Sequence, residues 1–232
     1  MRMAAAIKSV LLIRHGVTEM NEYLGSTPYG MPGFVDPGLF DTRLTERGRR
    51  QAEGLQQWLS EEHTRQPFDL VISSPLTRAL ATADIALGPV PARCDVDPDL
   101  AERCWLSSDV GRAPSEVAQD FPRFAKALGS LNDEWWWEGD RTAAEAAKGA
   151  RLTLQGAKVL EGVALAVEPS DHFLMRVQRF RDRLLAADEK RIVVFAHWGV
   201  FYALTGGRSM RNCEVVVCTA EELRVPLKAP PD

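Results

Sequence analysis

The sequence predicts an α/β fold, a three-layer α/β/α arrangement with a mostly parallel central sheet. Short apolar runs of strand length alternate with stretches whose apolar residues recur at helical spacing. Strands joined by helices run parallel and are covered on both faces. The 232 residues are enough for one fully packed domain. We expect a single domain over 1–232, with an irregular or helical insertion at about 131–167.

The first elements surround a long loop. The apolar run Ser9–Ile13 predicts a buried strand, after which Gly16 allows a sharp turn. A Gly- and Pro-rich loop follows from Glu22 to Asp41. A loop of this length beside a strand end is expected to form one wall of a pocket, a flexible surface excursion being the alternative. Thr45 then caps a helix that runs to about His63.

A second strand and helix form the middle of the chain. The strand is expected over Asp69–Ser73 and the helix over Pro75–Ala86, with its proline in the first turn. Gly88 and the prolines after it end that helix. A polar segment, 103–114, leads into a short helix that Pro122 stops.

The last part closes the sheet. An Ala-rich stretch after Trp135-Trp136-Trp137 is predicted to be helical, although each interior glycine costs about 1 kcal/mol there. Ser170 or a neighbour caps the next helix. A strand over Arg191–Ala196, a short helix over Gly199–Leu204 and a strand over Asn212–Thr219 follow.

Composition limits the partners. The net charge is −4, and Lys and Arg are scattered, which argues against nucleic acid or an anionic membrane as a partner. No run approaches the roughly 18 apolar residues of a membrane span. Four cysteines lack the close pairing of zinc sites and are too few for a disulfide scaffold. The N-terminus faintly resembles a signal peptide, but Lys8 interrupts it, so we expect a cytoplasmic protein, with organelle targeting and a homodimer left open.

Polar residues with phosphate-binding chemistry lie near the expected strand ends. Arg14-His15 follows the first strand, Arg78 lies near the start of the helix after the second, and His197 follows a third. Glu102 follows a Pro-rich connection. Open α/β sheets bind ligands at the carboxyl ends of their strands, so these five residues are candidates for a single site.

Five motifs, in order, resemble the histidine phosphatase superfamily, the phosphoglycerate-mutase-like fold. They are Arg14-His15-Gly16 with Thr18 and Asn21, Leu44–Gly48 with Gln51-Ala52, Ser73–Arg78 with Thr82-Ala83, Leu100–Arg103, and His197 with Gly199. The resemblance covers almost the whole chain. It implies a phosphohydrolase that cleaves a phosphorylated small molecule without a metal or other cofactor.

The resemblance also implies roles for the catalytic candidates. His15 is the expected nucleophile, which forms a phosphohistidine. Arg14 and Arg78 hold the phosphate through their fork-shaped donors. His197 donates to the phosphoryl oxygens as negative charge moves. Glu102 protonates the leaving oxygen and needs a raised pKa, although pairing with its neighbour Arg103 is the structural alternative.

Three further residues complete the expected phosphate site. Thr18 and Asn21 are expected to bind phosphate or to hold Arg14. Trp198 stands where the family usually has a small residue, and its backbone amide is the useful group there. Its side chain points away from the pocket or narrows it. Asp99 is a competitor for the general-acid role that fits the family pattern less well.

Two other functions compete with hydrolysis. A bisphosphoglycerate-dependent phosphoglycerate mutase hands the phosphoryl group back to its substrate. Mutases of this family have a basic, Tyr-containing stretch after the acid and a compact Trp-containing turn after the first loop. Here Arg103–Gly111 is poor in basic residues and carries Asp109, and the 22–41 loop replaces the turn. An inactive phospho-ligand-binding protein is the third reading, which the intact catalytic set disfavours.

Overall fold

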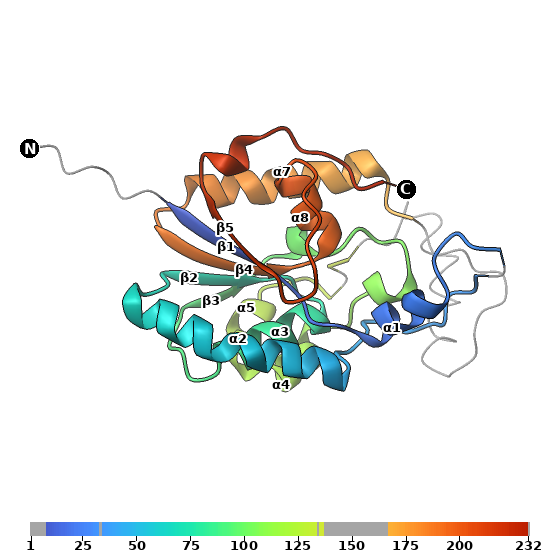
Figure 1. Cartoon of the computed structure of the whole chain (residues 1–232), viewed down its shortest axis with the longest axis horizontal. Helices are drawn as coiled ribbons and strands as arrows, with labels where there is room; N and C mark the ends of the chain where they lie inside the picture. Colours follow the sequence, from blue (N-terminus) through green and yellow to red (C-terminus); the bar gives the residue numbers. More distant parts are fainter. Residues whose placement is uncertain (1–7, 33, 134, 137–166, 232) are drawn as a thin grey trace, which may run out of the picture.

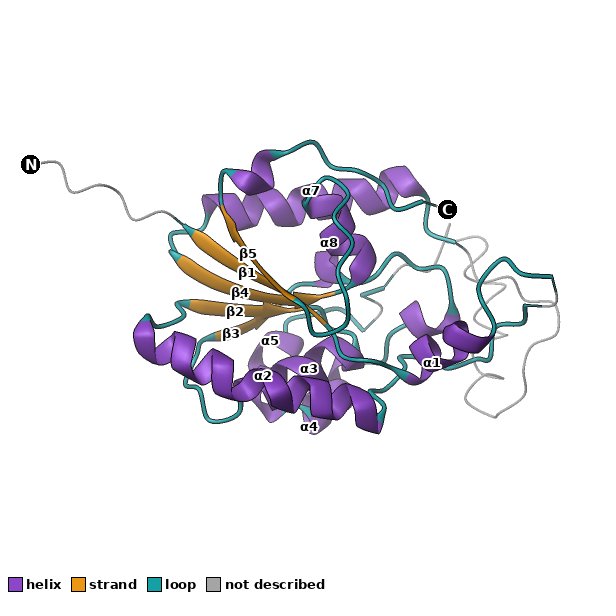
Figure 2. Cartoon of the chain, in the orientation of Figure 1, coloured by secondary structure: helices purple, strands orange, loops and turns teal. Residues whose placement is uncertain are grey.

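The computed structural model describes residues 8–32, 34–133, 135–136 and 167–231. In this part of the chain a five-stranded sheet lies between two helical layers (Figure 1). The helices α7 (Ser170–Ala186) and α8 (Trp198–Leu204) cover one face. Four helices lie on the other side (Figure 2): α2 (Glu46–Arg65), α3 (Thr77–Leu87), α4 (Pro114–Asp120) and α5 (Ala125–Leu128). The predicted three-layer α/β/α fold is confirmed.

The sheet is mostly parallel, as predicted. Its strands are β1 (Ser9–Arg14), β2 (Leu70–Ser73), β3 (Cys94–Val96), β4 (Arg191–Ala196) and β5 (Val215–Thr219). Their order is β3-β2-β4-β1-β5, and β5 runs antiparallel to β1. The central strands read as continuous apolar runs because successive side chains enter the two cores alternately. Val10 and Leu12 pack toward α7, whereas Leu11 and Ile13 pack toward α2 and α3.

The strand register determines where the polar residues meet. Arg14 of β1 pairs with Ala196 of β4, so that His15 and His197 follow neighbouring strand ends. Ser73 of β2 pairs with Phe195 of β4, which brings Ser74 to the same edge. Parallel strands end on one side of a sheet, and this edge therefore collects residues that are distant in sequence.

Three local expectations were wrong. The segment 22–41 begins as a helix, α1 (Glu19–Ser26), because Thr18 and Asn21 form a reciprocal capping box. Pro75 lies outside α3, which begins at Thr77 with Leu76 as its N-cap. The short strand β3, paired with β2, was not predicted. The predicted helical stretch in 131–167 lies almost entirely outside the described residues.

Two backbones touch where the loop after β1 meets α2. A Cβ on Gly48 would lie 2.0 Å from the carbonyl oxygen of Val17, and one on Gly16 would lie 2.6 Å from the carbonyl oxygen of Gly48. Neither position has room for a side chain. The amide of Gly16 also donates to Oγ1 of Thr82, which fixes the turn that carries the catalytic candidates.

Gly48→Ala is expected to destabilise the protein by about 1–3 kcal/mol, because its methyl group overlaps backbone rather than a flexible side chain. The matched control is Gly54→Ala in the same helix, where nothing lies within 4 Å of the new Cβ. That change should stabilise by about 0.5–1 kcal/mol, the usual helical advantage of Ala over Gly. Urea unfolding gives the free energy of unfolding of both variants. Equal changes in the two would contradict the close approach of Gly48 to the backbone of Val17.

No helix within the described ranges is long and apolar enough to cross a membrane. The four cysteines are free thiols. Burial raises the pKa of the Cys213 thiol to about 12, so it stays protonated at neutral pH.

Candidate active site

A pocket of about 250 Å³ opens at the carboxyl edge of the sheet. It brings together residues that the sequence spreads over almost the whole chain. Its lining includes seven of the eight predicted site residues, namely Arg14, His15, Thr18, Asn21, Arg78, Glu102 and Trp198. The eighth, His197, is fully buried just behind this lining, with its ring centroid 5.2 Å from that of His15.

The His15 ring is fixed by its own turn. Its Nδ1 lies 2.8 Å from the carbonyl oxygen of Gly16. A carbonyl only accepts, so Nδ1 carries the proton and Nε2 keeps its lone pair. Burial, followed by the charges of Arg78 and Arg14, lowers the pKa of His15 well below its usual value. The imidazole is therefore neutral at physiological pH, and Nε2 is available as a nucleophile.

His197 is also neutral, and its tautomer is set by Arg78. Nε of Arg78 donates to Nδ1 of His197 at 3.2 Å, which leaves the proton on Nε2. That nitrogen lies 2.8 Å from Oγ of Ser74, to which it donates. Burial and the charge of Arg78 lower the pKa of His197 well below its usual value. Donation to a phosphoryl oxygen thus requires the oxygen to replace Ser74 as the acceptor.

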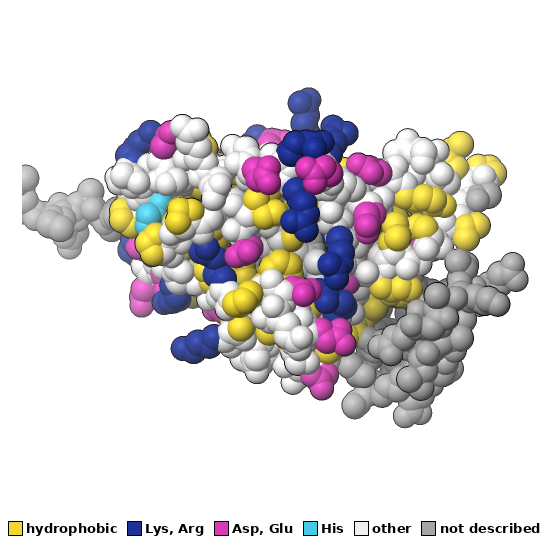
Figure 3. Space-filling view, turned by 90° about the horizontal axis from the view of Figure 1, so that it is seen from below, with side chains coloured by type: hydrophobic (Ala, Val, Ile, Leu, Met, Phe, Trp, Pro, Cys, Tyr) yellow, Lys and Arg dark blue, Asp and Glu magenta, His cyan; other side chains and the backbone are white. Residues whose placement is uncertain are grey.

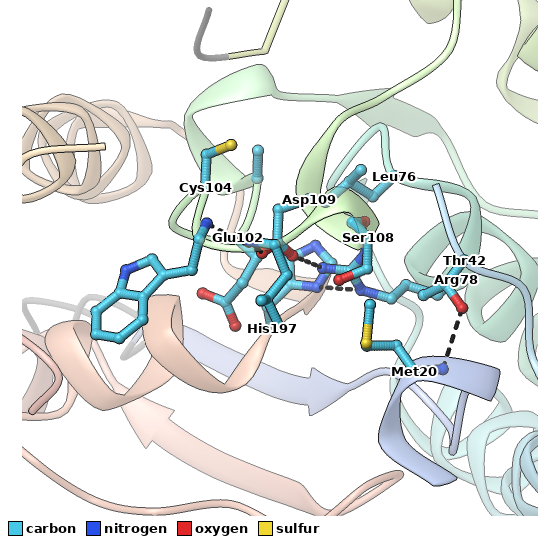
Figure 4. A network of polar contacts seen from close by, with 12 residues as sticks. Met20, Thr42, Leu76, Arg78, Glu102, Cys104, Ser108, Asp109 and His197 are labelled. Carbon is cyan, nitrogen blue, oxygen red and sulfur yellow. Dashed lines mark hydrogen bonds and ion pairs between the residues drawn. The ribbon is translucent and has the colours of Figure 1, made fainter. Parts of the chain in front are cut away.

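All three guanidinium nitrogens of Arg78 donate hydrogen bonds within the site. Figure 4 shows His197, Ser108 and Asp109 around its guanidinium, with Glu102 beside Asp109. Nη1 donates to the carbonyl oxygen of Ser108 at 2.6 Å, and Nη2 pairs with Oδ1 of Asp109 at 2.8 Å. The other oxygen of Asp109 accepts the amides of Trp105 and Leu106. The carboxylate is thus held firmly, and it fixes the direction of Arg78.

Arg14 has a donor to spare. Its Nη1 donates to the carbonyl oxygen of Met210 at 2.7 Å, whereas its buried Nε has no hydrogen-bond partner among the described residues. Burial lowers the pKa of Arg14, although not enough to remove the charge of a guanidinium. An unpaired buried N–H costs about 1–3 kcal/mol.

Glu102 lines the same pocket, and backbone amides hold its carboxyl group in place. Its Oε2 accepts the amide of Gly199 at 3.0 Å, and Oε1 accepts the amide of Arg103 at 2.9 Å. Burial and the neighbouring charge of Asp109 raise its pKa, against the lowering effect of the two amides. The competitor Asp99 is turned away from the pocket, because its carboxylate pairs with Arg179 and Arg183.

The sequence profile of the histidine phosphatase superfamily (branch 1) matches residues 10–208. The chain belongs to this superfamily. Its fold is similar to that of the alpha-ribazole phosphatase from Shigella flexneri, with a TM-score of 0.56 and 21% identity over 95% of each chain.

Two curated relatives match shorter stretches. Phosphoserine phosphatase 1 from Hydrogenobacter thermophilus is 40% identical over 74 residues, which are 32% of this chain and 28% of that protein. Agropine synthesis reductase from Rhizobium rhizogenes is 32% identical over 147 residues, which are 56% of this chain and 32% of that protein. The matches therefore span less than a third of each relative.

In this member of the superfamily, α7 anchors the loop that carries Glu102. Nη1 of Arg176 donates to the carbonyl oxygens of Asp99 and Ala101, and Nη2 donates to that of Glu102. The fully buried carboxylate of Glu168 pairs with Arg176 and accepts the amide of Cys104. Breaking a buried ion pair is costly, because it leaves an uncompensated charge. The pair of Arg176 with Glu168 therefore keeps Arg176, and the loop bonded to it, in place.

Thr18 and Asn21 line the pocket while capping α1. Oγ1 of Thr18 accepts the amide of Asn21, and Oδ1 of Asn21 accepts the amide of Thr18. Nδ2 of Asn212 donates to both Oδ1 of Asn21 and the carbonyl oxygen of His15. The two predicted residues therefore support the first loop, whereas Arg14 donates its hydrogen bond to the carbonyl oxygen of Met210.

Trp198 is one of the residues that line the pocket. Its Nε1 donates to Oγ of Ser209 at 2.9 Å, and its ring lies 5.3 Å from that of Tyr202. These two contacts hold the indole against Ser209 and Tyr202. The amide with a visible task at this helix start is that of Gly199, which holds Glu102.

Sequence reasoning did not assign three groups of the site. Asp109 was noted only as a departure from the mutases, although an acidic residue in the polar segment after Glu102 was a usable signal. Ser74 lies within a recognised motif but was given no role. Pro230 and Pro231 line the pocket from the far end of the chain, and no local pattern points to them.

Proposed function

We propose that the chain hydrolyses phosphate monoesters by transferring the phosphoryl group first to His15 and then to water. The observation that carries this proposal is the orientation of the His15 ring. Its Nδ1–H is fixed on the carbonyl of Gly16, so the lone pair of Nε2 is directed to the pocket that Arg14, Arg78 and Glu102 line. Membership of the superfamily supports the same reaction.

In the first step, the Nε2 lone pair of His15 attacks phosphorus and the bond to the leaving oxygen breaks. Glu102 gives its proton to that oxygen, so the product leaves as an alcohol. In the second step, Glu102 takes a proton from water as the water oxygen attacks phosphorus. The P–N bond then breaks, inorganic phosphate leaves and His15 is neutral again.

Positive charge for the transition state comes from the protein's arginines. Arg14 lines the pocket, and Arg78 is oriented by Asp109. Preorganised donors in a buried site stabilise developing charge without reorganising. Among the described residues, no group of three or more His, Cys, Asp or Glu side chains could hold a metal ion. We expect the activity to need no divalent metal and no cofactor.

The proposal is tested by comparing phosphate release with isomerisation. The purified chain is assayed in EDTA against a panel of sugar phosphates, phosphoglycerates, nucleotides and phosphopeptides. Conversion of 3-phosphoglycerate to 2-phosphoglycerate is followed in parallel, with and without bisphosphoglycerate. We expect phosphate release that survives chelation. Isomerisation that outpaces release by a wide margin would assign the chain to the mutases, and activity restored only by magnesium would reject the metal-free mechanism.

Asp109→Asn is expected to move the basic limb of the pH–rate profile to lower pH. The negative charge of Asp109 raises the pKa of Glu102, which must be protonated to act as an acid. Removing that charge lowers the pKa, so activity is lost earlier as pH rises. The measurement is kcat against pH for an alkyl phosphate. Asp120→Asn, on exposed α4, is the control, and an unmoved limb in Asp109→Asn would contradict the coupling.

A further inference from the structure

The pocket is divided into a charged base and an apolar wall. The base is formed by Arg14, His15, Arg78, Glu102 and Asp109. The remaining lining is mostly apolar or aromatic and includes Met20, Leu24, Tyr29, Trp105, Leu106, Trp198, Pro230 and Pro231. A phosphoryl group held at the base would direct the rest of the substrate along this wall. The residues of the wall should therefore determine which leaving groups bind well.

The aromatic rings of the wall are held in place by their neighbours. The rings of Tyr29 and Trp105 meet edge to face, with centroids 5.5 Å apart. The guanidinium of Arg103 lies 4.5 Å from the centroid of Trp105 and packs on that ring. Trp198 is fixed by Ser209 and Tyr202. Rings that are already oriented lose little freedom when a flat group packs against them.

The segment that carries Tyr29 is tied to the wall. Asp36 accepts the amide of Ser107 at 2.7 Å, which joins the Gly- and Pro-rich loop to the segment after Glu102. Apolar exposure continues outward from Tyr29, which is 50% exposed, to Met31 at 56% and Val35 at 57%. Figure 3 shows hydrophobic side chains gathered at the end of the molecule where Figure 1 places α1 and this loop.

Few charges in the lining could meet a second anionic group. Among the residues that the structure describes, the basic residues of the lining are Arg14, Arg78 and Arg103. The first two lie at the base, and Arg103 packs on Trp105 while its Nε donates to the carbonyl of Glu168. A carboxylate or second phosphate on the leaving group would lie largely against carbon, where desolvation is costly.

We infer that the preferred substrate is a phosphate monoester whose leaving group is uncharged and carries an aromatic ring. This inference rests on the proposed hydrolase function and names its substrate class. The phosphoryl group lies between Arg14 and Arg78, and the ring packs on Tyr29, Trp105 and Trp198. The volume of about 250 Å³ limits the leaving group to a small one.

The test compares esters of alcohols with similar acidity, so that the bond between phosphorus and the leaving oxygen breaks with similar ease in each. 2-Phenylethyl phosphate should exceed ethyl phosphate in kcat/KM by about 10- to 100-fold, the usual effect of burying one ring. 3-Phosphoglycerate, whose leaving group carries a carboxylate, should be the poorest of the three. p-Nitrophenyl phosphate reports catalytic competence independently, because its leaving group needs little protonation.

Wall variants connect the preference to named residues. Tyr29→Ala changes an exposed side chain, so folding is not at risk, and Trp105→Leu keeps an apolar wall without the ring. Each should reduce the ratio of kcat/KM for 2-phenylethyl over ethyl phosphate by about 2- to 10-fold, the scale of one aromatic contact. Trp58→Ala on α2 is the control and should leave the ratio unchanged. General damage to the fold would lower kcat/KM for both substrates together.

The possible results distinguish a failure of the aromatic preference from a failure of the hydrolase function. Hydrolysis of p-nitrophenyl phosphate together with equal use of the phenylethyl and ethyl esters would overturn the aromatic preference and leave the hydrolase function standing. A preference for 3-phosphoglycerate would do the same. Failure to release phosphate from any ester would overturn the hydrolase function and this inference with it.

Discussion

His15→Ala is expected to lose roughly 10⁴–10⁶-fold in kcat, the scale found when an enzyme loses its nucleophile. Arg14, Arg78 and Glu102 would remain, but nothing in the variant could accept the phosphoryl group. Because the replaced ring is buried, circular dichroism and thermal unfolding must show that the variant is folded. His63→Ala, which removes a histidine at the end of α2, is the matched control and should keep its activity.

The intermediate gives the more specific result. Rapid quenching with labelled substrate should trap a phosphoenzyme that is stable in base and labile in acid, as expected for a P–N bond. His15→Ala should trap none. An adduct that is stable in acid, or one that is labile in both acid and base as an acyl phosphate is, would show that the proposed nucleophile is wrong.

Glu102→Gln should slow the release of alkyl leaving groups by about 10²–10⁴-fold, the usual contribution of a general acid. The amide has the shape of the carboxyl but no proton to give to a departing alkoxide. The loss should be much smaller for the first step with p-nitrophenyl phosphate. Burial and Asp109 raise the pKa of Glu102. If Glu102 is the acid, its deprotonation should make activity fall as pH rises, and the variant should lose this basic limb.

Glu46→Gln at the exposed start of α2 controls for the chemistry of the substitution. Equal losses for alkyl and nitrophenyl substrates in Glu102→Gln would argue against proton donation. They would assign Glu102 to a positioning role instead. Burst kinetics with p-nitrophenyl phosphate separate the two steps, because water activation by Glu102 is needed only in the second.

The sequence predicts four of the five described strands for a physical reason. Strands buried on both faces leave an unmistakable run of apolar residues, and β4 was predicted with both of its ends correct. His15 and His197 directly follow such runs, so their proximity follows from parallel pairing. The roles assigned to them remain predictions until the phosphoenzyme is sought.

What the sequence did not predict depends on contacts between distant segments. Part of the helix α1 falls in a segment that was expected to be a Gly-rich loop, although Thr18 and Asn21 have the side chains of a capping box. The function of Asp109 depends on its contact with Arg78, which no local pattern contains. Pro230 reaches the pocket because the chain after β5 returns across it. These contacts are products of tertiary packing, and periodicity and propensity do not report them.

The anchoring of the Glu102 loop has an evolutionary consequence. Arg176 on α7 holds this loop through the backbone carbonyls of Asp99, Ala101 and Glu102, and none of its described hydrogen bonds is to the side chain of Trp105 or Leu106. Trp105 and Leu106 can therefore be replaced while the acid stays in place. Substitutions in the wall and in the chemical centre should then act nearly additively. Such separation lets a lineage explore new substrates by changing a few wall residues, without rebuilding the reaction each time.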